Sequence, residues 1–374
     1  MKKVSIIGGG AAGLACALHL ARRKTEVTVF ERGERLGRKL SATGNGQGNV
    51  TNVHMDETHY FSDDSERVQR TLSRFGWQDT VAFLESMGGV FLPDGRGRVY
   101  PAGRQASAIT DLFRRELERL RVRICLNAQV KALAYDGKFT LKWGGGQMNA
   151  DAVVLAAGGA AAPNFGTDGS AYALAQAFGH SVKNAAPSLV QLRCDPASVR
   201  GLKGIRVDSG LLLRRGGKTV YRTRGDVLFT DCGVSGDAVF RASAHAKEGD
   251  ELVLDLLPDA DEERVLQAVR RGGLYCVVNN GLGRVIAKRA EGAERIASLV
   301  KSFPLTVTGT LGFAYAQATK GGIPLKETDE NFMSLYRNDL YFAGEILNAD
   351  GECGGYNLQW AFATAFCVAE GVCC

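Results

Sequence analysis

The sequence lacks the residue patterns of metal-binding and disulfide-stabilised proteins. Its nine cysteines are an odd number and none forms a C-x-x-C pair, so neither a structural zinc site nor a disulfide framework is expected. The five histidines are scattered and form neither H-x-x-x-H nor H-E-x-x-H, so no metal is expected in catalysis. Free thiols are typical of a reducing compartment, and we expect a cytoplasmic protein.

Uninterrupted apolar runs are also missing. Met1-Lys2-Lys3 precedes eighteen uncharged residues, Val4 to Ala21, a pattern that resembles a secretory signal peptide. Four glycines, at positions 8, 9, 10 and 13, break the apolar core of this stretch. We therefore expect no signal peptide, no membrane-spanning segment and no membrane partner.

Glycine is the residue in excess, with 47 of 374 positions. The glycines cluster in short loops and form no repeat, which excludes a collagen-like or low-complexity chain. The 45% of hydrophobic residues and 23% of charged residues are those of a globular chain with a large core. A net charge of +6 is too small, taken over the whole chain, to indicate a nucleic-acid partner.

The first thirty residues carry the strongest motif. A short apolar strand over 3–7 is followed by the G-x-G-x-x-G of residues 8–13. A helix is expected over 14–23 and a second strand over 27–30, which ends in Glu31. This order of strand, glycine turn, helix, strand and acid is the dinucleotide-binding fingerprint.

Each position of the fingerprint has a physical role. Gly8 permits the tight turn, and Gly13 lets the helix lie close to the sheet. Gly10 lets the main chain approach a pyrophosphate at the helix N-terminus, where free N–H groups and the helix dipole favour anions. Glu31 can accept hydrogen bonds from the hydroxyls of the adenosine ribose.

Two later segments indicate FAD rather than NAD. Near the C-terminus, an expected strand over 340–342 ends in Gly344-Glu345, and 354–359 opens an apolar helix. A second helix N-terminus can hold the ribityl–pyrophosphate part of FAD or a flavin carbonyl edge. Between the two ends, the apolar strand 151–155 runs into small residues that suit close approach to a cofactor.

Four segments, in collinear order, resemble the BaiN/RdsA-type flavoproteins, an aminoacetone-oxidase-like family of bacterial FAD-dependent oxidoreductases. They are residues 37–52, 228–236, 319–323 and 343–361. The resemblance covers almost the whole chain. One departure stands out, because Gln47-Gly48 occupies the place where the family loop has Arg-Cys.

The resemblance implies an α/β fold: a Rossmann-like FAD-binding domain of the two-dinucleotide-binding-domain type, with an inserted β-rich, barrel-like domain and a small helical domain. We expect residues 1–185 and 310–374 to form the FAD domain, 186–258 and 302–309 the β-rich domain, and 259–301 the helical domain. The sequence agrees, because 259–301 carries apolar residues at helical spacing and 207–256 carries strand-like runs.

The predicted site residues follow from these motifs and from the resemblance. The expected non-covalent FAD contacts are Gly8, Gly10, Ala11, Ala12, Gly13, Glu31, Arg32, Arg38, Lys39, Leu40, Thr43, Gly44, Asn45, Val130, Ala157, Gly158, Gly159, Gly344, Glu345, Gly354, Gly355, Tyr356, Asn357 and Leu358. The expected catalytic residues are Cys353, Tyr356 and Asn45. Cys353 is included because the loop has lost the family cysteine; a small buried thiol is the alternative.

The chemistry is left open between several alternatives. Hydride transfer through the flavin is expected, with NAD(P)H as a transient donor, although no second G-x-G-x-x-G is present for a built-in nicotinamide domain. The resemblance also implies uracil reduction in ribosomal RNA, or an O2-using oxidase of small amines such as aminoacetone. A flavin-binding protein without catalysis is a further alternative. The sequence does not indicate an oligomeric state.

Basic residues gather in one part of the chain. Ten lie between Lys183 and Arg224, opposed there only by Asp195 and Asp208. A local charge of +8 suits a polyanion, and RNA is one partner that this stretch predicts. A solvated strand face is the alternative interpretation.

Overall fold

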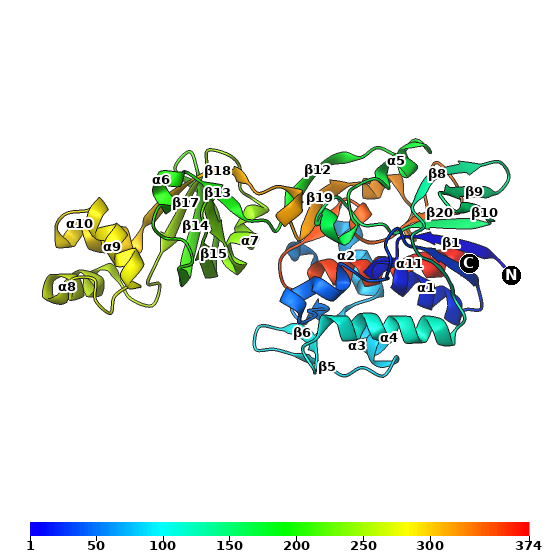
Figure 1. Cartoon of the computed structure of the whole chain (residues 1–374), viewed down its shortest axis with the longest axis horizontal. Coiled ribbons are helices and arrows are strands. Elements are labelled where there is room, and N and C mark those ends of the chain that lie inside the picture. Colours follow the sequence, from blue (N-terminus) through cyan, green and yellow to red (C-terminus); the bar gives the residue numbers. More distant parts are fainter. Residues whose placement is uncertain (374) are drawn as a thin grey trace. The chain divides into compact units, whose positions relative to one another are not determined.

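The computed structural model describes residues 1–373, which divide into two compact units. Unit 1 contains residues 1–186 and the chain from residue 318 onward, and unit 2 contains Pro187–Gln317. The first and last parts of the chain, blue and red in Figure 1, come together within unit 1. Residues 310–317, expected in the FAD domain, lie in unit 2 together with the helical residues 259–301.

A parallel five-stranded sheet forms the centre of unit 1. Its order is β20-β11-β1-β2-β7. The strands are β1 (Lys3–Ile7), β2 (Glu26–Phe30), β7 (Arg123–Cys125), β11 (Ala152–Leu155) and β20 (Leu340–Phe342). All of β11 and all but the first residue of β1 are buried, as expected for a parallel sheet covered on both faces. The carboxyl ends of β1, β11 and β20 therefore meet at one edge.

Two helices of small and apolar residues pack against each other in unit 1. They are α1 (Ala11–Arg22) and α11 (Tyr356–Cys373). A Cβ added at Gly344 would lie 2.8 Å from the Cβ of Ala12, so glycine allows the segment after β20 to lie against the start of α1. Trp360 and Phe362 of α11 are fully buried in the core. The first and last elements of the chain thus share one core.

Smaller elements complete unit 1. Its other helices are α2 (Ser65–Arg74), α3 (Trp77–Glu85), α4 (Ala106–Arg119) and α5 (Tyr172–Gln176). Its smaller sheets contain β3 (Thr51–Asn52), β5 (Phe91–Pro93) and β6 (Arg98–Pro101); β8 (Val130–Tyr135), β9 (Phe139–Trp143) and β10 (Gly146–Ala150); and the pair β4 (Tyr60–Ser62) and β21 (Ala349–Gly351). Strand β12 (Lys183–Ser188) pairs with β19 (Ala318–Gly322). Short 3-10 helices include η1 (Leu40–Gly46) and η3 (Pro163–Phe165).

Unit 2 contains a closed barrel with the order β13-β16-β15-β14-β17-β18. The strands are β13 (Leu192–Cys194), β14 (Arg206–Arg215), β15 (Lys218–Phe229), β16 (Gly233–Ser235), β17 (Glu251–Asp255) and β18 (Phe303–Thr310). Alternate residues such as Leu211 and Leu213 face a buried core, as the period of a strand requires. The predicted barrel-like insertion is confirmed.

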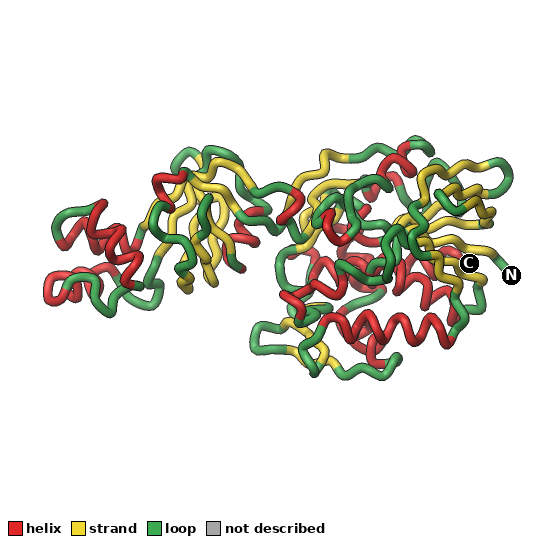
Figure 2. The backbone as a smooth tube through the Cα atoms, viewed as in Figure 1, coloured by secondary structure: helices red, strands yellow, loops and turns green. Residues whose placement is uncertain are grey.

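Unit 2 also contains helices, and those within residues 262–301 pack together at one end of the barrel (Figure 2). The helices are α6 (Pro196–Val199), α7 (Asp237–Ser243), α8 (Glu262–Gly272), α9 (Asn280–Arg289) and α10 (Ala293–Lys301). Asp261 caps α8 by accepting a hydrogen bond from the Arg264 N–H at 2.8 Å. No helix within residues 1–373 is both long enough and apolar enough to cross a bilayer.

Candidate functional site

The glycine turn between β1 and α1 shows one open position. A Cβ added at Gly13 would lie 1.9 Å from the Gly8 carbonyl oxygen, and one at Gly8 would lie 2.4 Å from the Ala156 oxygen. Gly8 also has a φ of +114°, which an L side chain rarely adopts. At Gly10, the N-cap of α1, an added Cβ would meet nothing within 4 Å. The open space therefore lies at a helix N-terminus, where a pyrophosphate is favoured.

Glu31 is held beside this turn by the main chain. Its Oε2 accepts a hydrogen bond from the Gly9 N–H at 2.9 Å, and its Oε1 accepts from the Gly33 N–H at 2.7 Å. Each oxygen keeps a second lone pair, and the residue is half-buried. The Glu31 carbonyl accepts from the Ala128 N–H at 2.8 Å, which brings the start of β8, with the predicted contact Val130, next to this acid. The arrangement fits an adenosine ribose.

The two predicted arginines after Glu31 are tied to another loop. Arg32 pairs with Asp168 at 2.6 Å, and Arg38 donates to the Asn164 carbonyl at 2.8 Å. Burial opposes the ionisation of Asp168, but hydrogen bonds from Arg32 and Ser170 outweigh it and hold the pKa of Asp168 at about 2. Both arginines thus fasten the 164–170 loop, and their contacts to FAD stay predictions.

A polar network joins three segments that are far apart in sequence. Glu345 accepts from Lys39 Nζ at 2.7 Å and from the Thr319 N–H at 2.9 Å. Thr319 Oγ1 in turn accepts from the N–H groups of Ala160 and Ala161 at 2.8 and 2.9 Å. The network fixes the loop after β11, where the predicted contacts Ala157, Gly158 and Gly159 lie, to the segment after β20.

A buried hydroxyl near this network has no partner. The oxygen of Tyr172 is enclosed and makes no hydrogen bond within the described residues. Burial first, and the nearby Glu345 second, raise the pKa of Tyr172. A buried hydroxyl without a hydrogen-bond partner destabilises the folded protein, and a polar group of a bound ligand would supply that partner.

The loop that carries most of the family resemblance exposes its main chain. Residues 44–47, at the end of η1 and directly after it, are exposed. Gly44 (φ +58°) and Asn45 (φ +54°) both have left-handed conformations. The Thr43 hydroxyl donates to the Leu40 carbonyl at 2.7 Å and closes the start of the loop. Exposed backbone groups without bulky side chains suit the edge of a flat ring such as a flavin.

The last glycine pair lies against the strand that follows this loop. A Cβ at Gly355 would lie 2.5 Å from the Thr51 oxygen, and the Asn52 amide donates to the Gly354 carbonyl at 3.1 Å. The structure therefore brings together two sets of predicted residues, 40–45 and 353–358, from opposite ends of the chain.

The predicted FAD contacts Tyr356 and Asn357, beside that pair, have protein partners. The Asn357 amide accepts from the Gly351 N–H at 2.9 Å and donates to the Gly351 carbonyl at 2.7 Å. The Tyr356 ring is buried and stacks on His59 at 4.5 Å between ring centroids. Cys353 is half-buried. Asn357 and Tyr356 thus fix the start of α11, and catalytic roles for Tyr356, Cys353 and Asn45 stay predictions.

Sequence reasoning missed two side chains at this place, Tyr100 and Arg104. The Tyr100 ring lies 3.5 Å from the position of a Cβ at Gly44, and the Arg104 guanidinium lies 4.0 Å from the Tyr100 ring centroid. The signal in the sequence is three arginines, at positions 96, 98 and 104, around a lone tyrosine. No known motif marks that pattern, and only folding places it beside the η1 loop.

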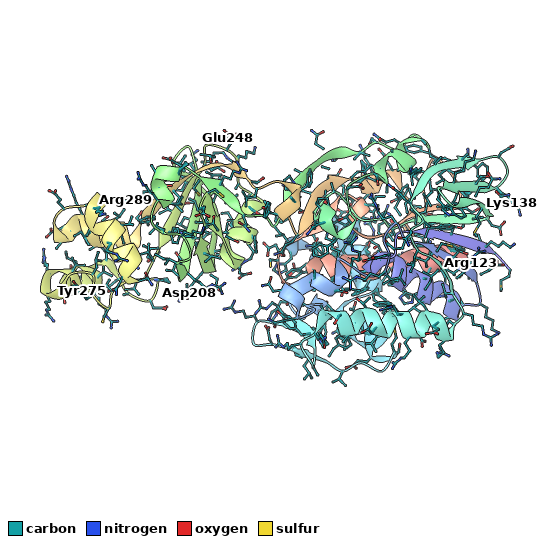
Figure 3. All side chains as sticks on the ribbon, viewed as in Figure 1. Arg123, Lys138, Asp208, Glu248, Tyr275 and Arg289 are labelled. Carbon is teal, nitrogen blue, oxygen red and sulfur yellow. The ribbon has the colours of Figure 1, made fainter. Side chains whose placement is uncertain are left out.

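Ion pairs reduce the charge of the basic stretch. Lys203, Arg206, Arg214, Arg215 and Arg224 pair with carboxylates within unit 2, and Lys183 pairs with Asp63 within unit 1. Asp208, at the barrel surface in Figure 3, is one of two acids bound by Arg224. Arg193, Arg200, Lys218 and Arg222 have no carboxylate within 4.0 Å in the described part of the chain. Most of the acids lie outside the stretch, so its sequence overstates its unpaired charge.

The sheet order, the open glycine turn and the anchored acid define a Rossmann-like FAD-binding fold. The chain belongs to the HI0933-like Rossmann-domain family, whose model matches residues 2–371. The predicted BaiN/RdsA-type family is confirmed. Fold and family are those of FAD-dependent oxidoreductases.

Two curated relatives span nearly the full chain. The chain is 34% identical to a 3-dehydro-bile acid delta(4,6)-reductase of Clostridium scindens, with 98% of each protein covered. It is 28% identical to a ribosomal RNA dihydrouridine synthase of Haemophilus influenzae, with 97% of this chain and 96% of the relative covered.

A solved structure shows the same fold at low identity. It is the 3-ketosteroid-delta4-(5alpha)-dehydrogenase of Rhodococcus jostii, with a TM-score of 0.56 and 18% identity over 100% of this chain and 97% of that one. A flavocytochrome c3 fumarate reductase matches with a TM-score of 0.51 and 17% identity over 99% of this chain and 77% of that one. These matches show the fold alone.

Proposed function

We propose that this chain is an FAD-dependent reductase that saturates a carbon–carbon double bond conjugated to a carbonyl group. The main observation in support of an FAD enzyme is the open position at Gly10, which lies at the N-terminus of α1 and beside the anchored Glu31. The names of the two relatives support the substrate class. A 3-oxo compound reduced at carbons 4 and 6 and a uracil reduced to dihydrouracil both contain such a double bond.

When bound, FAD supplies a hydride for this chemistry. The chain supplies the binding groups: the free N–H groups around Gly10 for the pyrophosphate, and the Glu31 carboxylate for the adenosine ribose. The exposed backbone of residues 44–47 and the glycine pair before α11 would border the ring. The unpartnered Tyr172 hydroxyl offers one further hydrogen bond.

A reduced nicotinamide from solution is the proposed electron donor. Only one G-x-G-x-x-G exists in the sequence, and it lies at the turn assigned to FAD. A donor that binds transiently and leaves before the substrate enters needs no second fingerprint.

The experiment is anaerobic reduction of the purified yellow protein with NADH and with NADPH, followed by one equivalent of a 3-oxo-4-ene steroid. We expect one nicotinamide to bleach the flavin and the steroid to restore the colour, with one saturated product per flavin.

Other outcomes would favour the other functions. Colour restored only by a uridine-containing ribosomal RNA fragment would assign the substrate to RNA, contacted through residues 183–224. Peroxide release with aminoacetone would identify an amine oxidase. A flavin bleached only by dithionite and restored by no acceptor except oxygen would indicate a flavin-binding protein without catalysis.

A further inference from the structure

Tyr100 combines a buried ring with a hydroxyl that no protein group satisfies. The residue is only 6% exposed, and its hydroxyl makes no hydrogen bond to any residue within 1–373. Its oxygen is not one of the enclosed atoms, in contrast to that of Tyr172. Buried tyrosines usually find a partner for the hydroxyl. The ring is therefore packed, while the hydroxyl oxygen is not fully enclosed and makes no hydrogen bond to the described residues, so it can still meet a ligand.

Tyr100 lies where the η1 loop and the turn before α11 come together. Its strand β6 pairs with β3 through Thr51 and Val99, and β3 follows directly on the η1 loop. The Tyr100 ring touches the space beside Gly44, and the Cys353 thiol is close enough to influence the pKa of Tyr100. The hydroxyl thus lies between the exposed loop and the turn before α11.

Two arginines flank the Tyr100 ring, but only one has its charge paired. Arg98 lies 6.0 Å from the ring centroid and forms an ion pair with Asp94 at 2.9 Å. Arg104, at 4.0 Å, has no carboxylate within 4.0 Å in the described residues, and its hydrogen bond goes to Gln47 Oε1 at 3.4 Å. An unpaired guanidinium at this distance stabilises negative charge that develops on the phenol.

The protonation state of Tyr100 fits an acid. Burial is the largest influence and raises the pKa of Tyr100, with smaller increases from Asp94 and Cys353. Arg98 and Arg104 oppose these effects without cancelling them. The phenol therefore carries its proton throughout the neutral range and gives it up only to a strong base.

We propose that the Tyr100 hydroxyl donates the proton that completes the reduction and that Arg104 stabilises the phenolate left behind. This inference rests on the proposed function. When bound, reduced FAD would supply the hydride for a C–H bond at the β-carbon of the substrate, and the π pair of the broken double bond would move toward the α-carbon and carbonyl. The O–H bond of Tyr100 then breaks, its proton forms the α-carbon C–H bond, and water reprotonates the phenolate. The substrate gains two electrons and two hydrogens, and a reduced nicotinamide restores the flavin.

The test is Tyr100→Phe, with Tyr275→Phe as the matched control. Tyr275 is 81% exposed on the helical part of unit 2, where Figure 3 labels it. Because the Tyr100 hydroxyl has no protein partner, Tyr100→Phe keeps its melting temperature and its FAD content. We expect the enone to reoxidise reduced Tyr100→Phe about 100-fold more slowly than wild type, while NAD(P)H bleaches both flavins equally fast. Tyr275→Phe matches wild type in both steps.

Three further readouts separate proton donation from a structural role. Binding of a saturated 3-oxo steroid, measured through the change in flavin absorbance, should be equally tight in wild type and Tyr100→Phe. We therefore expect the substitution to lower kcat and to leave KM unchanged. The wild-type rate falls at high pH as Tyr100 ionises, and the residual Tyr100→Phe rate does not. In the apoprotein, the ultraviolet difference titration of the two proteins shows one phenol that ionises above the ordinary tyrosine range.

The role of Arg104 is tested separately. Arg104→Ala should slow enone reduction about tenfold, and Arg104→Lys should restore most of the rate.

The outcomes are distinguishable. Wild type that is reduced by NAD(P)H but inert toward the steroid, 2-cyclohexenone and uridine overturns the proposed function, and this inference with it. Wild type that reduces the enone while Tyr100→Phe does so equally fast, with an unchanged pH profile, overturns the role of Tyr100 alone. A difference titration centred below the ordinary tyrosine value of 10.0 would also contradict it.

Discussion

The contacts within unit 1 and those within unit 2 are of different kinds. In unit 1, main chain approaches main chain, as where Gly13 meets Gly8 or Gly355 meets Thr51. In unit 2, charged side chains cross the barrel surface, as where Arg224 binds Asp208 and Asp259. A close backbone contact tolerates no added methyl group, whereas an exposed ion pair is screened by water and contributes little. Single substitutions should therefore affect the two units very unequally.

The largest effect is expected at the glycine turn. Gly10→Leu fills the open space at the N-terminus of α1, so we expect the protein to fold and to purify without colour. Gly95→Leu adds the same side chain in an exposed turn and should retain FAD. Flavin absorbance per protein and the melting temperature are the measurements. Full FAD occupancy in Gly10→Leu would show that the pyrophosphate lies elsewhere.

A smaller loss is expected at the acid of the fingerprint. Glu31→Gln places an NH2 group where a carboxylate oxygen accepted a backbone N–H, and it weakens the bond to a ribose hydroxyl. We expect the Kd for FAD to rise about tenfold, which is about 1.4 kcal/mol. Glu26→Gln, exposed at the start of the same strand, is the control. Titration of apoprotein with FAD decides, and equal affinities would remove Glu31 from the site.

In unit 2 the expected effect is on stability alone. The Asp250 side chain is 2% exposed and accepts two hydrogen bonds from Arg215 at 2.8 Å and one from the Lys247 N–H. Asp250→Asn should cost about 1 kcal/mol at neutral pH and leave FAD affinity unchanged. Loss of FAD from this variant would contradict the contrast between the units.

The same pair predicts a pH dependence. The Arg215 hydrogen bond first, with the Lys247 N–H, holds the pKa of Asp250 below its ordinary value of 3.8, against the effect of burial. Its stabilisation is therefore complete above that value and is lost as the pH falls through the lower pKa of the folded state. Hydrogen exchange of unit 2 should show wild type and Asp250→Asn converging only below pH 3.8.

The smallest effect is expected from unpaired surface charge. Replacing Lys218 and Arg222 together by alanine should weaken the binding of a ribosomal RNA fragment about two- to threefold and reduce the salt slope by about 2. Replacing the paired Lys203 and Arg206 removes the same formal charge and should change binding less. Equal effects of the two double variants would show that pairing does not control this surface.

The parts that the sequence predicted well depend on main-chain geometry. Only glycine fits at positions 8 and 13, so this turn always has the same glycine spacing and can be recognised from the sequence. Strands β1 and β11 are continuous apolar runs because both faces of the sheet are covered, and this too is visible in one dimension. For the same reasons the resemblance to the family extended along the whole chain.

What the sequence could not predict depends on partners from distant segments. Lys39 was expected as an FAD contact, and the structure pairs it with Glu345, which lies 306 residues away. The basic stretch looked unopposed because Asp250 and Asp259 come after it in the chain. The Tyr100 hydroxyl has no hydrogen bond to the described part of the chain, and only the folded structure reveals this, because no sequence pattern marks an unsatisfied hydroxyl.

The strand order of unit 1 also has a consequence for biosynthesis. β20 pairs with β11, yet the whole of Pro187–Gln317 is translated between them. The Thr319 and Glu345 contacts and helix α11 can therefore form only after residues 187–317 have been synthesised. Until β20 has been synthesised, the edge of β11 lacks its partner strand, and the predicted FAD contacts over 344–358 are still missing.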